Sequence, residues 1–439
     1  MAAPPWVPPD AERAVGLEFY ATRTPGVGGE LKEHPEDFLV HEISAYPVPD
    51  SEGPFTVLRI ASRDWEQHEL AQRIAQVLGL PPHAIDWAGT KDRRAVAERL
   101  FSYRGPPPEH LDLPNVELQD AYRARSGLVL GHHYGNAFEI RVPLRGAAPA
   151  EARSTWEATR AELAAVGGVP NLFGLQRFGE VRPITHEVGR WIVRGDLSRA
   201  VDAYLTARSD ETEGPGAEAR RAFAEHRDPV RALREFPPSF RFERTLLDHL
   251  ARGQSPARAL RGLSRELRML FVHAYQSLLF NRWASARWTA GLSLTVPEPG
   301  DYLLRLARDG TVPGNVPIPV SQDNLPECRD LARRGRAQLA GPLVGFETPR
   351  LTGAPGELLA KLLEQEGVQP SDFRLPQLPE IASRGSFRPL VVPLPPVGLR
   401  VEASEERGPS ATFTFALPKG AYATVLLREF LKTGARPGG

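Results

Sequence analysis

Patterns typical of β-strands lie near both ends of the chain and enclose a long helical middle. Residues 55–62 (FTVLRIAS), 97–104 (AERLFSYR) and 137–145 (AFEIRVPLR) are rich in β-branched, aromatic or alternating apolar residues. Strand patterns return after Gly385, in PLVVPLPPVGLRVEAS and ATFTFALP. The middle of the chain shows helical periodicity instead. We therefore expect one sheet domain assembled from both ends of the chain and split by an insertion.

The turn and cap signals predict where individual elements begin and end. Asp64 is the expected N-cap of a helix that stops at Gly79. Residues 128–131 and 137–145 are expected to pair as a hairpin around HHYGN. Helices are expected over residues 149–166, 187–208, 217–226, 244–251, 264–290 and 423–433.

Length and composition favour a soluble, globular, multidomain protein. The 439 residues suffice for two or three domains, and 41% are hydrophobic and 25% charged. No apolar run approaches the roughly 18 residues of a membrane span. The N-terminal MAAPPWVPPDAER lacks the pattern of a signal peptide, and its proline density predicts a disordered arm over residues 1–15. The single cysteine, Cys328, excludes disulfides and cysteine-based metal sites, so we expect a reducing, cytoplasmic location.

The charge balance argues against a protein that nucleic acid holds through bulk charge alone. The formal net charge is zero, which still permits a local basic face. One candidate is the stretch 251–270, where five arginines accompany a single acid, Glu266. A solvated helix face and an RNA contact both remain open for this stretch.

Lysine and asparagine are unusually rare in this chain. Of 54 basic side chains only five are lysine, so each retained lysine is a candidate for a place where arginine would not serve, with chance as the alternative. The five lysines are Lys32, Lys91, Lys361, Lys419 and Lys432. The six asparagines are Asn115, Asn136, Asn171, Asn281, Asn315 and Asn324. Six of these eleven residues fall in six short segments that are dense in glycine or aromatic residues.

Several common kinds of site lack support. The chain has no Walker loop, no G-x-G-x-x-G and no G-x-S-x-G, so it offers no motif for a nucleotide cofactor or an elbow-type serine hydrolase. His132 and His133 are adjacent and would point to opposite faces of a strand, which disfavours a shared metal. Glu36 and Asp37 could be half of a glycosidase pair, but adjacent carboxylates more often occupy a solvated turn.

Asp92 is the strongest candidate for chemistry. It stands in WAGTKDRRAV with Lys91 on one side and Arg93 and Arg94 on the other. Three flanking cations favour the ionised carboxylate, which suits a nucleophile or a base. A turn that neutralises its own charges is the alternative, and this motif alone leaves both interpretations open.

Six segments together resemble the TruD family of pseudouridine synthases. They are KEHPEDFLVHE (residues 32–42), AGTKDRRAV (88–96), GNAFEIRV (135–142), GVPNLFGLQRFG (168–179), AYQSLLFN (274–281) and LPKGAYATVLLRE (417–429). They follow the family's order from one end of the chain almost to the other. Each piece alone is weak, but the combination is specific.

The resemblance implies an α+β fold and an RNA-modifying activity. The expected catalytic domain is a pseudouridine synthase fold, with a largely antiparallel sheet and flanking helices, assembled from residues 1–167 and 385–439. An inserted α/β domain occupies residues 168–384. The family isomerises uridine to pseudouridine without a cofactor or a metal. The implied partner is tRNA, with uridine 13 as the expected target, and no membrane or protein partner is expected.

The resemblance also assigns roles to individual residues. Asp92 corresponds to the catalytic aspartate, which attacks C1′ or takes a proton from C2′. Phe138 stacks on the flipped base, and Asn136 shares its strand face. The other residues expected to bind substrate are Lys32, Lys91, Arg93, Arg94 and Arg177.

Two other classes of function remain to be tested. One is a non-catalytic RNA-binding or RNA-folding protein of the same fold, which would not need an ionised carboxylate against a polyanion. The other is a carboxylate hydrolase, for which the sequence offers no plausible second carboxylate.

In the helix expected over residues 264–290, most side chains are assigned to the core, with Asn281 as the one exception considered.

Overall fold

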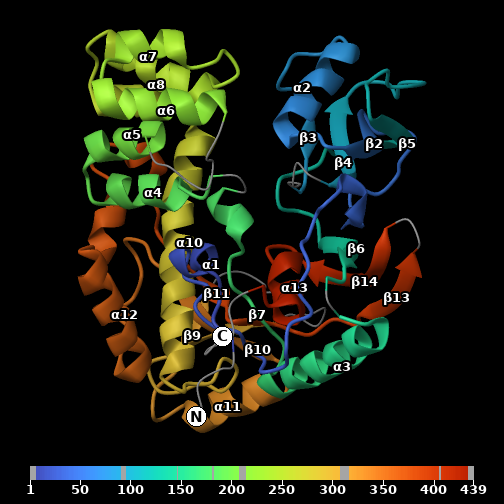
Figure 1. The fold of residues 1–439 in the computed structure, drawn as a ribbon, viewed down its shortest axis with the longest axis vertical. Helices are drawn as coiled ribbons and strands as arrows, with labels where there is room; N and C mark the ends of the chain where they lie inside the picture. The colour runs from blue at the N-terminus through green and yellow to red at the C-terminus, as the bar shows by residue number, and fades with distance from the viewer. Residues whose placement is uncertain are drawn as a thin grey trace. The chain divides into compact units, whose positions relative to one another are not determined.

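The structure is a computed structural model that describes residues 6–89, 95–145, 147–179, 182–206, 214–306, 316–404 and 407–433. The chain divides into two compact units, and each is described by itself (Figure 1). Unit 1 comprises Met1–Trp6, Ala21–Ala165 and Pro393–Gly439, and unit 2 comprises Val7–Tyr20 and Val166–Val392.

Unit 1 is built on an eight-stranded sheet among its described residues. Along the sheet the strands follow the order β13-β14-β6-β1-β4-β2-β5, and β3 pairs with β4. Every pairing is antiparallel except that of β1 with β4. The strands are β1 (Phe38–Ile43), β2 (Phe55–Arg63), β3 (Asp86–Trp87), β4 (Val96–Arg104), β5 (Val116–Ala124), β6 (Gly135–Pro143), β13 (Gly398–Ser404) and β14 (Gly408–Pro418).

Helices cover the two ends of one face of this sheet. The helices of unit 1 are α2 (Gln67–Val77), α3 (Pro149–Val166) and α13 (Ala423–Leu431), with a 3-10 turn, η1 (Pro35–Asp37). At the β2–β4 end, the apolar side of α2 packs on Phe101 and its neighbours. At the β14 end, the ring of Phe413 lies 5.1 Å from that of Trp156 in α3 and 5.1 Å from that of Phe430 in α13.

The strand register shows that both helical layers lie on the same face. Directly paired residues of neighbouring strands point to the same side of a sheet. Phe413 pairs with Ile140, and Ile140 pairs with Phe38. Alternation along β1 and its pairing with β4 carry the same face to Phe101. The middle of this face, on β1, β6 and β4, therefore lies between the two helical layers.

Unit 2 is organised around the long helix α10 (Arg265–Thr289), drawn in yellow in Figure 1. Its Tyr275 hydroxyl donates to Glu366 of α12 at 2.9 Å. The other helices are α1 (Asp10–Ala14), α4 (Thr185–Val193), α5 (Leu197–Thr206), α6 (Pro215–His226), α7 (Pro229–Glu235), α8 (Arg241–Ala251), α9 (Pro256–Arg261), α11 (Leu325–Arg333) and α12 (Gly353–Glu366). The 3-10 turns are η2 (Leu175–Phe178), η3 (Pro370–Arg374) and η4 (Pro379–Ile381).

Two small sheets complete the described part of unit 2. One has the strand order β11-β10-β8-β9, and the other pairs β12 with β7. The strands are β7 (Val169–Pro170), β8 (Tyr302–Arg305), β9 (Pro317–Pro319), β10 (Ala337–Leu343), β11 (Ser386–Pro389) and β12 (Val391–Val392). The four-stranded sheet lies against α10, since a β-carbon on Gly341 of β10 would stand 2.5 Å from the Trp283 ring.

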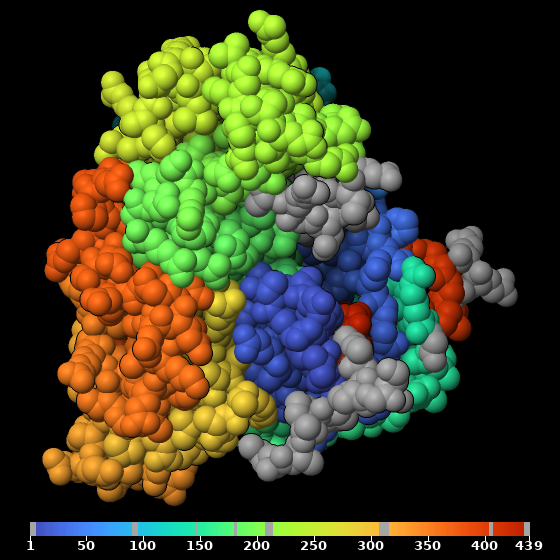
Figure 2. Space-filling model, turned by 60° about the vertical axis from the view of Figure 1, so that its left-hand side comes forward, coloured from blue at the N-terminus to red at the C-terminus, as the bar shows by residue number. Residues whose placement is uncertain are grey.

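The expected disordered arm over residues 1–15 is wrong for its second half. Asp10–Ala14 form α1, and the following Val15 is buried. The Val15 carbonyl accepts a hydrogen bond from Asn281 of α10 at 2.9 Å, and the Gly16 carbonyl accepts one from Ser285 at 2.8 Å. Figure 2 shows the blue surface of the N-terminal segment beside the yellow surface of α10. These long-range contacts outweigh the local proline signal.

The expected hairpin between residues 128–131 and 137–145 is also wrong. Strand β6 pairs with β1 and β14, which are far away in the sequence, and residues 128–130 form no strand. The Gly131 amide instead donates to the Ala88 carbonyl at 2.7 Å. Strand β5, which was not among the predicted strands, occupies the outer edge beside β2.

Three smaller predictions need correction. Glu66, not Asp64, is the N-cap of α2, because its side chain accepts from the Glu69 amide while Asp64 takes a left-handed φ of 56°. The single helix expected over residues 187–208 is two helices, α4 and α5, separated by a turn at Gly195. The first strand expected after Gly385 is divided into β11, β12 and β13, interrupted by Leu390 and by the prolines of residues 393–397.

The expected fold class is confirmed. The chain combines helices with a largely antiparallel sheet, as the α+β prediction requires. Among the described residues, no helix has the length and apolar character needed to cross a membrane.

Candidate active site

Four predicted site residues, Lys91, Asp92, Arg93 and Arg94, lie outside the described residues. The residues on either side of them are described. Ala88 accepts the hydrogen bond from Gly131, and the buried Ala95 accepts one from the Asp64 amide at 3.2 Å. Both flanks of the AGTKDRRAV segment are therefore tied to the fold of unit 1.

A row of polar side chains crosses the middle of the sheet face that faces α2, α3 and α13. Glu42 of β1 is paired directly with Asn136 of β6, and Arg99 of β4 stands level with Glu42, one residue beyond the pair His41 and Glu98. The Arg99 Nη1 donates a hydrogen bond to Asn136 Oδ1 and lies 3.8 Å from Glu42 Oε2. The three residues form one connected polar cluster across three strands.

Glu42 is a buried carboxylate with unfilled hydrogen-bonding capacity. Its side chain is 1% exposed, and neither carboxylate oxygen has a hydrogen-bond partner of normal geometry in the described part of the chain. Burial raises the pKa of Glu42, and Arg99, the Gly89 amide and Arg59 oppose that rise. A buried acid of this kind is costly and is found mainly at functional sites.

Gly89 brings the backbone onto this cluster. A β-carbon at Gly89 would stand 3.0 Å from Glu42 Oε2 and 3.4 Å from the imidazole of His133. Burial, together with the nearby charges of Arg99 and Lys419, lowers the pKa of His133. The segment that leads to Asp92 thus starts directly beside Glu42, on the polar row.

An aromatic row lies next to the polar row on the same face. Phe138, two residues after Asn136 on β6, is paired with Val40 and with Phe415. Its ring centroid lies 6.0 Å from that of Phe38 and 5.5 Å from that of Phe415. The Phe138 side chain is half-buried, so the packing fixes the ring and leaves part of it accessible. Asn136 and Phe138 are brought together as a polar and an aromatic surface.

Lys32 joins the aromatic row from the loop before β1. It is 6% exposed, and its Nζ lies 4.7 Å from the centroid of the Phe38 ring. Its backbone has a left-handed φ of 62°, a conformation that costs energy for residues other than glycine. A buried cation on a strained backbone agrees with a functional rather than a solvent-exposed lysine.

Arg177, the remaining predicted substrate ligand, belongs to unit 2. It lies in η2, where its Nε donates to Ser277 Oγ of α10 at 3.2 Å and its guanidinium lies 5.9 Å from the Phe173 ring. Phe173 and Phe178, on either side of it, are buried. Within unit 2 these contacts hold the Arg177 side chain against α10 and Phe173.

Asn281 and Asn171, two of the rare asparagines, are structural in unit 2. Asn281 is fully buried, accepts from the Phe173 amide at 2.8 Å and donates to the Phe173 and Val15 carbonyls. Asn171 donates to the Pro389 carbonyl at 2.9 Å. The suggestion that Asn281 is an exception to the core of α10 is therefore wrong, because its amide satisfies buried backbone groups.

Two other candidate features are part of the scaffold. Asp37 is buried and accepts two hydrogen bonds from Arg407, at 2.8 and 2.9 Å, so it does not occupy a solvated turn. In the basic stretch 251–270, Arg261 and Arg268 both pair with Glu380. That stretch is therefore partly neutralised inside unit 2.

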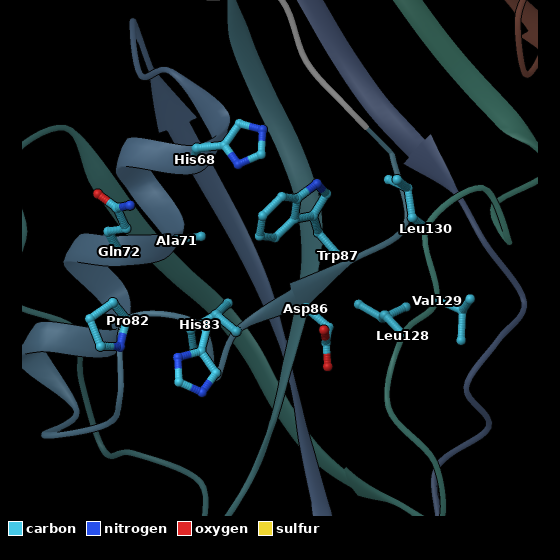
Figure 3. A pocket seen from close by; sticks show the side chains of 11 residues that line it. His68, Ala71, Gln72, Pro82, His83, Asp86, Trp87, Leu128, Val129 and Leu130 are labelled. Carbon is cyan, nitrogen blue, oxygen red and sulfur yellow. The ribbon is translucent and has the colours of Figure 1, made fainter. Parts of the chain in front are cut away.

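A cavity of about 560 Å³ opens in unit 1 between α2, β3 and residues 128–130 (Figure 3). Trp87 lies on its wall, two residues before Gly89, with its ring edge-on to His68 at 5.0 Å. Val129 and Leu130, on the opposite wall, are exposed. The cavity adjoins the segment that leads to Asp92.

Sequence reasoning missed Glu42 and Arg99 as parts of the site, and it considered His133 only as a metal ligand. Glu42 lies in the segment KEHPEDFLVHE but carries no distinguishing signal there, and Arg99 is one of many arginines. Only the strand register brings Arg99 and Glu42 level with Asn136. Among the described residues, no group of three or more acidic, histidine or cysteine side chains is placed to hold a metal ion.

Comparisons with known proteins identify the family of this chain. The family described as TruD, tRNA pseudouridine synthase D, matches residues 14–430. "Probable tRNA pseudouridine synthase D" of Halobacterium salinarum is 39% identical over 96% of this chain and 97% of its own. The protein of the same name from Methanococcoides burtonii is 34% identical over 97% of this chain and 98% of its own.

A solved structure supports the same assignment. The crystal structure titled "Putative tRNA pseudouridine synthase D (TruD) from Methanosarcina mazei" matches with a TM-score of 0.81 and 32% identity, and the match covers 97% of this chain and 98% of that chain. The resemblance noted in the six sequence segments is confirmed. The chain belongs to the tRNA pseudouridine synthase D (TruD) family of isomerases.

Proposed function

We propose that this protein isomerises uridine to pseudouridine in tRNA, with Asp92 as its catalytic residue and without a cofactor. The observation that carries the proposal is that Asn136 and Phe138, two positions apart on β6, share the middle of the sheet face next to Gly89. A flipped base needs an aromatic surface and a few directed polar groups. Both kinds of group stand there, at the start of the segment that contains Asp92.

The reaction exchanges one glycosidic bond for another. The N1–C1′ bond breaks, the base turns, and a C5–C1′ bond forms. C5 then loses a proton and N1 gains one, so substrate and product are isomers. Asp92 assists by attacking C1′ or by taking a proton from C2′, and both routes need its carboxylate ionised.

The other proposed substrate ligands have distinct tasks. Phe138 stacks on the target base and retains it once it is detached, and Asn136 hydrogen-bonds to it. Lys32 supplies positive charge beside the aromatic row. Lys91, Arg93 and Arg94 position backbone phosphates, and Arg177 makes a further RNA contact.

The finer points of substrate and organisation are also proposals. We propose uridine 13 of tRNA as the target and a cytoplasmic location. We further propose that residues 1–167 and 385–439 form the catalytic domain and that residues 168–384 form the inserted domain. The compact units are compatible with an insertion, because unit 1 contains both a segment before Val166 and one after Val392.

The competing proposal is an RNA-binding or RNA-folding protein of the same fold without catalysis. A direct test is to incubate the purified protein with an unmodified tRNA transcript and map pseudouridine at single-nucleotide resolution. We expect one modified position, uridine 13, and no modification of a transcript with cytidine there. Binding without any modification would support the non-catalytic alternative, and modification at another position would overturn the choice of target.

A further inference from the structure

The side-chain amide of Asn136 has a defined orientation. Arginine has only donors, so the Asn136 atom that meets Arg99 Nη1 must be the carbonyl oxygen, Oδ1. The Nδ2 group therefore faces away from Arg99. It has no hydrogen-bond partner among the described residues. A half-buried amide thus presents two unused N–H donors on the same face as Phe138.

Burial and charge hold Arg99 in this position. Arg99 is 3% exposed, and Glu42 Oε2 lies 3.8 Å from the same Nη1 that donates to Asn136. Glu42 lies between the two residues in the sheet, because β1 separates β4 from β6. The Arg99 guanidinium must extend across Glu42 to reach Asn136. The attraction of the Glu42 carboxylate stabilises this position of the Arg99 side chain. A reversed amide would set the Asn136 NH₂ group against the guanidinium, donor to donor.

We propose that Arg99 is a positioning residue, seated by Glu42, that presents the Asn136 NH₂ group as a fixed donor and so selects uracil over cytosine. The inference rests on the proposed function, in which Asn136 binds the target base. Uracil offers a carbonyl acceptor at C4, whereas cytosine carries an amino donor there. A fixed NH₂ donor can hydrogen-bond to the C4 carbonyl of uracil. It faces another donor, the amino group, when the base is cytosine.

The expected discrimination is large because the site is partly desolvated. A site built to hydrogen-bond one group rejects an analogue that leaves its buried donors unpaired. We expect the wild type to bind RNA with uridine at the target position roughly 10-fold or more tightly than RNA with cytidine there. Without Arg99, the Asn136 amide can rotate by 180° and present its oxygen. The ratio of the dissociation constants for the cytidine and uridine RNAs should then fall towards 1.

The test measures the ratio of the two dissociation constants in three variants. The RNAs are identical stem-loops with uridine or cytidine at the target position, and the binding measurements use an Asp92→Asn background so that uridine is not consumed. Arg99→Met removes the donor and nearly keeps the volume. Arg99→Gln keeps an N–H donor for Asn136 Oδ1 and is the matched control. Asn136→Asp replaces the free NH₂ group by an acceptor while keeping the hydrogen bond to Arg99.

The proposal expects a different ratio for each variant. Arg99→Met should lose most of the preference for uridine, and Arg99→Gln should keep it. Asn136→Asp should reverse it towards cytidine, whose amino group can donate to the new carboxylate. An unchanged preference in Arg99→Met, or a retained preference for uridine in Asn136→Asp, would overturn the proposal. Asn136→Asp decides the matter by itself if Arg99→Met fails to fold.

A kinetic measurement separates this inference from the proposed function. With Asp92 intact, tritium release from uridine C5 is measured for the wild type, Arg99→Met and Arg99→Gln. We expect Arg99→Met to lower kcat/KM by roughly 10-fold or more, as for a misplaced hydrogen bond, and Arg99→Gln to restore most of it. An inactive wild type would overturn the proposed function itself. An active wild type with an equally active Arg99→Met would overturn only the role of Arg99.

Discussion

The backbone of Gly89 lies against the carboxylate of Glu42, so closely that a β-carbon at Gly89 would stand 3.0 Å from Glu42 Oε2. The Glu42 side chain has little room to move, because it is buried and Arg99 lies beside it. This contact joins the segment that leads to Asp92 to the row that orients Asn136. It explains physically why a glycine stands at this point of the AGTKDRRAV segment.

Gly89→Ala should lower activity more than stability. The added methyl group must displace either the Glu42 side chain or the backbone around residue 89, which leads to Asp92. A small misplacement of reacting groups costs roughly 10-fold to 100-fold in kcat. The matched control is Gly79→Ala, where a β-carbon meets no atom within 4 Å but the backbone has a φ of 67°. That control should lose about 1 kcal/mol of stability and keep kcat. Equal kcat for Gly89→Ala and the wild type would refute the importance of this contact.

Phe138→Ala should weaken retention of the flipped base. Stacking of a base on an aromatic side chain contributes about 1–3 kcal/mol, so kcat/KM should fall roughly 5-fold to 150-fold. Phe413→Leu is the control, since Phe413 is fully buried between α3 and α13. It should lower the melting temperature and leave kcat nearly unchanged. The stacking role fails if Phe138→Ala turns over at the wild-type rate.

Lys32→Arg should reduce activity although it preserves the charge. Lys32 is buried against the Phe38 ring. The guanidinium of an arginine there would be larger and planar, so it would not fit the space that the compact ammonium occupies. Lys361→Arg, on the exposed side of α12, should be neutral. Steady-state tritium release from both variants makes the comparison. If both variants match the wild type, the inference drawn from rare lysines does not hold at Lys32.

The pH profile should depend on Glu42. Burial raises its pKa above the ordinary value of 4.5, so the carboxylate takes up a proton at a higher pH than a free glutamate does. Protonation removes the negative charge that seats Arg99, and therefore kcat/KM should fall as the pH drops through this raised pKa. The other charged or titratable groups near Glu42 are Arg99 and Arg59, and His133 lies near Gly89 as well.

Glu42→Gln removes this titration and keeps the shape of the side chain. Its acid limb should move to lower pH, with a reduced plateau because the charge is missing at every pH. Profiles of kcat/KM for both proteins between pH 4.5 and pH 8 provide the comparison. Superimposable acid limbs would show that Glu42 does not control the profile.

The sequence predicted elements whose signals are local. Pro149–Val166 is a helix with the predicted bounds, and α10 (Arg265–Thr289) lies within the helix expected over residues 264–290. Pairing between distant strands has no local signal. The sequence therefore suggested residues 128–131 as the partner of β6. In the structure β6 pairs with β1 on one edge and with β14 on the other.

The candidate site was predictable only where residue type and motif coincide. Asn136 and Phe138 are two positions apart in one strand, so the period of two alone predicts that they share a face. The contribution of Arg99 depends on the parallel pairing of β1 with β4, which no pattern in the sequence indicates. Rarity was an ambiguous guide, because Lys32 reaches the aromatic row whereas Asn281 serves the packing of unit 2.

The most direct test of the account is tritium release from tRNA labelled at uridine C5, measured in single turnover for the wild type, Asp92→Asn and Asp92→Glu. Asp92→Asn keeps the size of the side chain and removes its charge, and Asp92→Glu keeps the charge and moves it. We predict release of one equivalent by the wild type, none above background by Asp92→Asn with RNA binding retained, and strongly slowed release by Asp92→Glu. Wild-type release by Asp92→Asn would contradict the account.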